Sequence, residues 1–370
     1  MKKPTTLLRS FSSRLSTRLA PSPAVAPWPP VRSAYDRWLA AELEELRADP
    51  LTPCTSATWL ARALSVAAAA QRRLIVASGA ASEAGAGIDR RTIDECADDT
   101  AELLDACAGL RDRLSVLRGY VAAARTALRW LEGGHGGEAA AQRAAAAFAE
   151  CEAMERRCGA VLAKCGSNLR RLGERAVLSG RQPAAGGHRS GGEEALSGAR
   201  ALALLAVGAL GAALTFRPRR NVSGLAGHAG GGKAAAQWEF ALQEVQKRVR
   251  EEYDRRRKEG VPCMAELDAA AAAGRAVRCT IAGGQRCPER VAAAALRRCN
   301  ELEDAVAELE EKVGELHREL IGVRIVLLEW AQRARGHELL RFDYTPWQWT
   351  PPHSEASCPR FSWSRKSDVN

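Results

Sequence analysis

Residues 299–330 read CNELEDAVAELEEKVGELHRELIGVRIVLLEW, and their apolar positions recur at alternating intervals of four and three residues. This spacing places apolar side chains along one side of an α-helix, where they pack against other helices. We call this repeat the heptad seam, and it consists of Leu302, Val306, Leu309, Val313, Leu316, Leu320, Val323 and Leu327. The seam predicts a long helix packed along its whole length, and it carries nothing catalytic.

A second repeat of the same kind lies far earlier in the chain. Thr92 and Glu95 form a capping-box pattern at its start, which is typical of a helix N-terminus. Its apolar positions are Ile93, Cys96, Thr100, Leu103, Cys107, Leu110, Leu114, Leu117, Val121, Ala124, Leu128 and Leu131. Because each apolar side needs a partner, the sequence predicts an all-α fold, a long-helix bundle with heptad-patterned helices.

The other helices are expected in two halves of the bundle, residues 33–177 and residues 234–340. Gly260 and Pro262 end one helix, a variable loop is expected around 274–288, and Pro288 opens the final helix. The final helix, about residues 288–340, contains the heptad seam, and other helices are predicted over about residues 33–48, 56–80, 138–177 and 234–259.

Four other segments have the composition of arms, linkers or tails. Residues 1–32 are basic and contain no acidic side chain, which fits either a disordered basic arm or an organellar transit peptide. Residues 178–200 and 217–233 are rich in glycine and are predicted to be linkers. Residues 341–370 lack helical periodicity and are predicted to be an irregular tail.

Residues 201–216, ALALLAVGALGAALTF, form an apolar segment without any charge. As a helix this segment would be about 24 Å long, short of the roughly 30 Å hydrocarbon layer of a bilayer. Three readings stay open: a spanning or re-entrant membrane helix, a buried bundle helix, and an interfacial helix. The composition favours the membrane reading over the other two, with a segment marked by Ala201, Leu205, Leu210 and Phe216.

The chain has a formal net charge of +10, which indicates anionic partners such as a membrane surface. The arginines are scattered, and no zinc-finger, RRM or basic-helix pattern accompanies them, so nucleic acid is not predicted as a partner.

Residues with catalytic or metal-binding chemistry form no recognisable motif. The eleven cysteines include no C-x-x-C pair, and the six histidines are scattered. Gly227 to Lys233 match a P-loop pattern, but Ala234 replaces the Ser or Thr that would hold magnesium. We therefore predict no cofactor, no metal and no enzymatic activity.

The order of motifs resembles the BYPASS family of land plants, with its ROH relatives, over about residues 33–335. In place of the family's usual aromatic-leucine pair, this chain has Cys96 and Ala97. The matching motifs are Thr58-Trp59-Leu60, Leu103-Leu104-Asp105-Ala106-Cys107, Gln237-Trp238-Glu239-Phe240 and the closing repeat from Glu301 to Leu327.

The resemblance implies a non-enzymatic plant protein of root and shoot development that restrains a root-derived mobile signal. ROH relatives bind Exo70 subunits of the exocyst, so a secretory adaptor is the alternative. Members are often membrane-associated and some are plastid-directed, which implies the cytoplasmic face of a membrane or, alternatively, the chloroplast.

Partner proteins are expected to bind through helix surfaces. The heptad seam suits a parallel homodimer, yet residues 93–131 of the same chain could cover it instead.

Overall fold

The computed structural model describes residues 33–48, 52–80, 88–131, 138–156, 191–216, 237–285 and 287–342. These ranges are helical and contain no strand, which confirms the predicted all-α fold. The helices are α1 (Ala34–Ala48), α2 (Ala57–Ala80), α3 (Arg90–Leu131), α5 (Gly191–Ala213), α6 (Gln237–Glu259), α7 (Ala265–Ala282) and α8 (Glu289–Phe342), with a further helix over residues 138–156.

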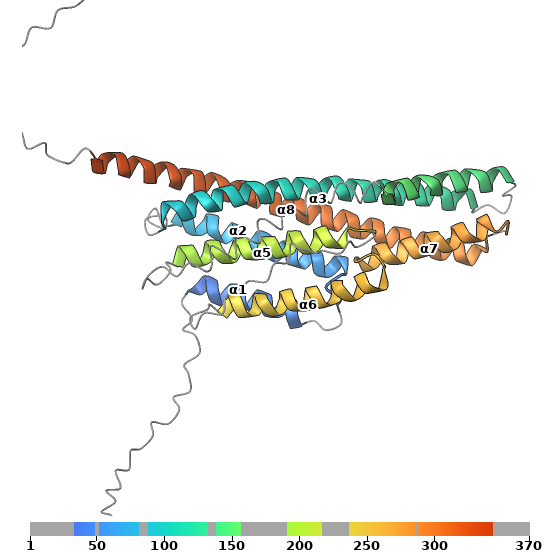
Figure 1. Cartoon of the computed structure of the whole chain (residues 1–370), viewed down its shortest axis with the longest axis horizontal. Helices are drawn as coiled ribbons and strands as arrows, with labels where there is room; N and C mark the ends of the chain where they lie inside the picture. The colour runs from blue at the N-terminus through green and yellow to red at the C-terminus, as the bar shows by residue number, and fades with distance from the viewer. Residues whose placement is uncertain are drawn as a thin grey trace, which may run out of the picture.

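The two heptad-patterned helices, α3 and α8, pack against each other over much of their length (Figure 1). Near one end Arg324 Nη1 donates a hydrogen bond to the Ala97 carbonyl at 2.9 Å, and further along Arg125 pairs with Glu303. Since α3 numbers rise where α8 numbers fall, the two helices are antiparallel. The second repeat is therefore a true partner of the first.

α2 covers the other side of α8 and runs parallel to it. Arg72 pairs with Glu315 at 2.9 Å and with Glu319 at 2.8 Å, and one turn later a Cβ at Gly322 would meet Ile75. Exposed ion pairs of this kind contribute little to stability, so apolar packing between the helices dominates. Each residue of the heptad seam is at most 4% exposed, because α2 and α3 lie against it.

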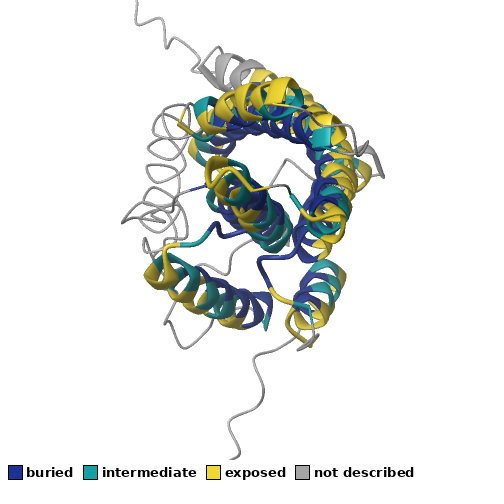
Figure 2. Cartoon of the chain, turned by 90° about the vertical axis from the view of Figure 1, so that its right-hand side faces the viewer, coloured by how far each residue is buried: buried dark blue, intermediate teal, exposed yellow. Residues whose placement is uncertain are grey.

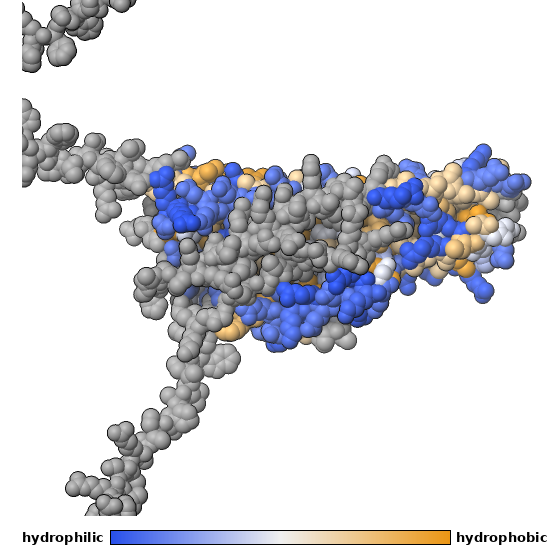
Figure 3. All heavy atoms as spheres, in the orientation of Figure 1, coloured by the Kyte–Doolittle hydropathy of each residue, from blue (hydrophilic) through white to orange (hydrophobic). Residues whose placement is uncertain are grey.

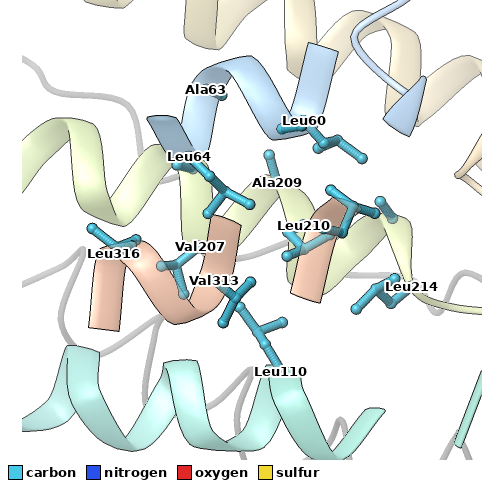
Figure 4. Packing of buried hydrophobic residues seen from close by; sticks show 14 of the residues in the cluster. Leu60, Ala63, Leu64, Leu110, Val207, Ala209, Leu210, Leu214, Val313 and Leu316 are labelled. Carbon is cyan, nitrogen blue, oxygen red and sulfur yellow. The ribbon is translucent and has the colours of Figure 1, made fainter. Parts of the chain in front are cut away.

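α5 lies at the centre of the bundle and contacts α1, α2, α3 and α6. Figure 4 shows Val207 and Leu210 of this helix among Leu64 of α2, Leu110 of α3 and Val313 of α8. The helices turn their buried residues inward and leave the exposed ones on the outside (Figure 2). The middle of α5 has no exposed face, since every residue from 201 to 210 is buried.

The N-termini of α2 and α7 are bound by groups from distant parts of the chain. Glu252 of α6 accepts a hydrogen bond from Thr55 Oγ1 at 2.7 Å, and Glu266 of α7 accepts one from the Ala57 amide at 3.1 Å. In return, the Ala265 amide at the start of α7 donates to the Thr55 carbonyl at 3.1 Å. A carboxylate at a helix N-terminus accepts hydrogen bonds from the free N–H groups there, and its negative charge is attracted to the positive end of the helix dipole. These contacts fix where α2 and α7 begin.

α1 and α6 form the outer pair of the bundle. Asp36 of α1 is 2% exposed and accepts a hydrogen bond from the Trp238 amide in the first turn of α6, at 3.2 Å. α5 comes close to this pair at Gly198, where an added Cβ would lie 2.7 Å from Leu39 Cδ2 and 3.4 Å from Trp238.

Two predicted boundaries are wrong. The linker expected over 178–200 ends earlier, because α5 begins at Gly191, and its first-turn acids Glu193 and Glu194 suit a helix N-terminus. The loop expected around 274–288 is shorter, because α7 continues through an alanine-rich stretch to Ala282.

Several other predicted segments lie outside the described residues. They are the arm 1–32, the linker 217–233, the end of the 138–177 helix, and the tail apart from residues 341–342, which belong to α8.

Substituting Gly198 tests how closely α5 approaches the outer pair. We expect Gly198→Leu to destabilise the fold by about 1–3 kcal/mol or more, because the site is filled by Leu39, Tyr35 and Trp238. Gly314→Leu is the matched control: an added Cβ there meets only Arg318 at 3.7 Å, and helix propensity should stabilise by up to about 1 kcal/mol. Urea unfolding followed by circular dichroism measures both, and equal effects would contradict the packing described.

Candidate functional site

The described part of the chain contains no group of three His, Cys, Asp or Glu side chains that could hold a metal ion. An interior cavity of about 20 Å³ lies between α2, α3, α5 and α8. This volume suits a single water molecule. It is too small for a cofactor or a metabolite.

A buried ion pair lies beside this cavity. Arg200 of α5 pairs with Asp99 of α3 at 2.5 Å, and both side chains are at least 86% buried. Gln71 of α2 donates a hydrogen bond to the Ala199 carbonyl at 2.9 Å. Breaking such a pair by removing one partner costs several kcal/mol, because the other charge stays buried. The cluster therefore fixes α5 against α2 and α3.

The predicted membrane residues lie inside the bundle. Ala201, Leu205, Leu210 and Phe216 are between 0% and 7% exposed. Among the described helices, α5 is the one that is long and apolar enough to cross a membrane, over Gly192–Ala213. Protein buries 78% of its most apolar 18-residue stretch. Length and composition support membrane contact weakly, since a buried core helix has the same composition.

Polar groups from other helices bind the backbone of α5 directly. Arg113 of α3, 1% exposed, donates to the Leu214 carbonyl just beyond the helix at 2.9 Å, and Tyr253 of α6 donates to the Ala209 carbonyl at 2.9 Å. The Met264 amide donates to the Ala213 carbonyl at 3.2 Å. The last carbonyls of a helix need such partners when they are buried. These donors were not predicted, because they lie far from α5 in the sequence.

The heptad seam is also inaccessible. α2 and α3 occupy it, as the intramolecular alternative expects, so a second copy of the chain has no access to the seam in this fold. A homodimer would need another surface.

About half of the residues in the three short family-like motifs are core residues. Trp59 is 3% exposed and donates its indole N–H to the Leu46 carbonyl at 3.0 Å, while Cys107 and Trp238 are at most 1% exposed. Thr58, Asp105 and Phe240 are exposed, Phe240 with half of its side chain in solvent. The buried residues of these motifs therefore contribute to packing between the helices.

A surface that the sequence did not predict lies on the outer side of α8. Ile321, Ile325 and Leu328 are 42%, 53% and 42% exposed, and their spacing of four and three residues places them on one helix face. We call these three residues the α8 stripe. Among the coloured atoms of the face in Figure 3, hydrophilic and hydrophobic groups alternate. The spacing of these three residues is visible in the sequence, but they lie in the same apolar run as the seam residues and cannot be told apart from them there.

The buried cysteines have the properties of small apolar residues. Burial raises the pKa of Cys96 to about 11 and the pKa of Cys151 to about 12, so both thiols stay protonated at neutral pH. A thiol is a nucleophile and a metal ligand only as the thiolate. Each thiol has a higher pKa in the folded chain than in the unfolded chain. Its contribution to the free energy of unfolding is therefore complete below pH 9 and is lost as the pH rises through 11 to 12.

Thiol labelling tests this assignment. At pH 8 we expect a small maleimide to modify the exposed Cys279 rapidly, while buried Cys96, Cys107 and Cys151 react only after unfolding in urea. Mass spectrometry of peptides from folded and unfolded samples gives the extent of modification at each cysteine. Rapid labelling of Cys107 in folded protein would contradict the packing of α3.

Comparison with known proteins identifies the family of this bundle. A family model described as Protein BPS1 matches residues 86–329, which include α3, α5, α6, α7 and most of α8. No curated protein and no solved structure is similar enough to match the chain. The matched region covers more than half of the sequence and confirms the resemblance stated from the motifs. The chain belongs to the BPS1 family, the BYPASS family of plant developmental regulators.

Proposed function

We propose that this BYPASS-family protein acts without catalysis, by binding a partner protein through the α8 stripe. The observation that supports the proposal is the stripe itself: three large aliphatic side chains, 42–53% exposed, on a helix whose other side is fixed in the core. Clustered exposed apolar groups mark interaction sites more often than scattered ones do. Residues at this spacing suit contact with an amphipathic helix of a partner.

Root and shoot development, with restraint of a root-derived mobile signal, is the process in which we place this binding. Family membership supports that placement. The alternative is an ROH-like adaptor that binds an Exo70 subunit of the exocyst during secretion. Both use the same kind of surface, so the identity of the partner separates them.

We also propose that the protein works at the cytoplasmic face of a membrane. The net charge of +10 supports contact with anionic lipid, and the apolar α5 supports it weakly. Since α5 is covered by protein, the contact we infer is peripheral and electrostatic. The basic residues 1–32 support the chloroplast as an alternative location.

Substitution of Ile325 tests the binding surface. We expect Ile325→Glu to remove partner proteins that co-purify from plant extract, while thermal stability stays unchanged, because the side chain is 53% exposed. Ala307→Glu is the matched control, exposed on the same side of α8 about five turns earlier. Quantitative mass spectrometry compares the captured proteins, and purified Exo70 is tested separately. Identical sets of captured proteins for wild type and Ile325→Glu would exclude the α8 stripe as the binding site.

Vesicle sedimentation tests the membrane proposal. We expect the full-length chain to sediment with phosphatidylserine vesicles at low salt and to leave them at high salt, because screening weakens exposed charge contacts. Neutral phosphatidylcholine vesicles are the control. Retention through high salt and alkaline carbonate would instead indicate insertion of α5. Deleting residues 201–216 is unsuitable for this test, because it removes core residues and is expected to unfold the bundle.

A further inference from the structure

The α8 stripe stands out among the exposed apolar residues of the protein. Six large hydrophobic side chains are exposed in the described part of the chain, and three of them are Ile321, Ile325 and Leu328. The other three lie singly on α2, α3 and α6. Isolated exposed residues are common, whereas a cluster on one face is a candidate for cover by another segment.

A segment suited to cover the stripe follows α8 directly. α8 ends at Phe342, and the remaining residues 343–370 lie outside the described ranges. This tail contains three of the nine tryptophans of the chain, Trp347, Trp349 and Trp363. Tryptophan gains more than most residues from burial against aliphatic side chains.

The length of the tail allows it to reach the stripe. At 1.5 Å per helical residue, Leu328 lies about 21 Å and Ile321 about 32 Å from the end of α8. At about 3.3 Å per extended residue, Trp349 can return about 23 Å and Trp363 about 69 Å from the same point. Trp349 can therefore reach Leu328, and Trp363 can reach every residue of the stripe with chain to spare.

The other terminal segment is less suited to this position. Residues 1–32 precede α1, which packs against α2, α5 and α6. Their charge is entirely basic, and the exposed Arg318 lies next to the stripe. The tail carries three acidic and three basic side chains, so its net charge is zero and it can approach Arg318 without net repulsion.

We propose that the aromatic segment 344–363 folds back onto the α8 stripe of its own chain and covers it. The partner of the proposed function and this segment then compete for one surface, and release of the tail controls partner binding. The competition rests on the proposed function, whereas the intramolecular contact does not.

Site-specific photo-crosslinking of the full chain tests the contact. With p-benzoylphenylalanine in place of Ile325, we expect crosslinks to peptides from residues 343–370 in a species of monomer mass. The matched control places the same group at Glu311, exposed on the same face two heptads earlier, where tail crosslinks should be largely lost. Crosslinks to residues 1–32, crosslinks between two copies, or none at position 325 would each overturn the proposal.

A tail variant separates this inference from the proposed function. Combining Trp347→Ser, Trp349→Ser and Trp363→Ser should remove most of the crosslinked product and increase the amount of partner captured, with unchanged thermal stability. If the crosslinks persist in this variant, the tryptophans do not make the contact and the proposal fails. Loss of partner capture by Ile325→Glu without any tail crosslink would leave the proposed function standing and would overturn only the intramolecular contact.

Discussion

The fold depends on covering one helix, α5, on every side. A helix that is apolar all round has no stable exposed face in water, so it needs either lipid or a complete shell of protein. Here α1, α2, α3 and α6 provide that shell. The shell must also satisfy polar groups, and the donors of Gln71, Arg113 and Tyr253 reach backbone carbonyls at or beside α5.

The same packing leaves little room inside the described part of the bundle. A core built to cover a central helix leaves little interior volume, and the cavity beside Asp99 and Arg200 holds about 20 Å³. The polar groups buried there are occupied in holding α5, and the raised pKa values of the buried thiols keep them unreactive. Membership in the BYPASS family accords with a regulatory function.

The sequence predicted best where structure follows from local periodicity. The seam residues Leu302 to Leu327 and the repeat from Ile93 onward predicted α8 and α3, because a seven-residue spacing defines one side of a helix. The cover of α5 could not be predicted, because its partners lie far away in the chain and a core helix has the composition of a membrane helix. Gly198 indicated a linker by composition, but the structure uses it for a close helix approach. The α8 stripe was hidden for a related reason: Ile321 and Ile325 alternate with seam residues in one apolar run.

The reciprocal capping of α2 and α7 has a consequence for biosynthesis. Thr55 and Ala57 find their partners Glu252 and Glu266 only after about two hundred further residues have been translated. The seam that α2 and α3 cover arrives later still. On the ribosome, the first half of the nascent chain therefore exposes apolar helix faces before the helices that cover them have been translated. Exposed apolar surface of this kind is what chaperones bind. Complete burial of the inner faces of α2 and α3 thus requires that α8 has been translated.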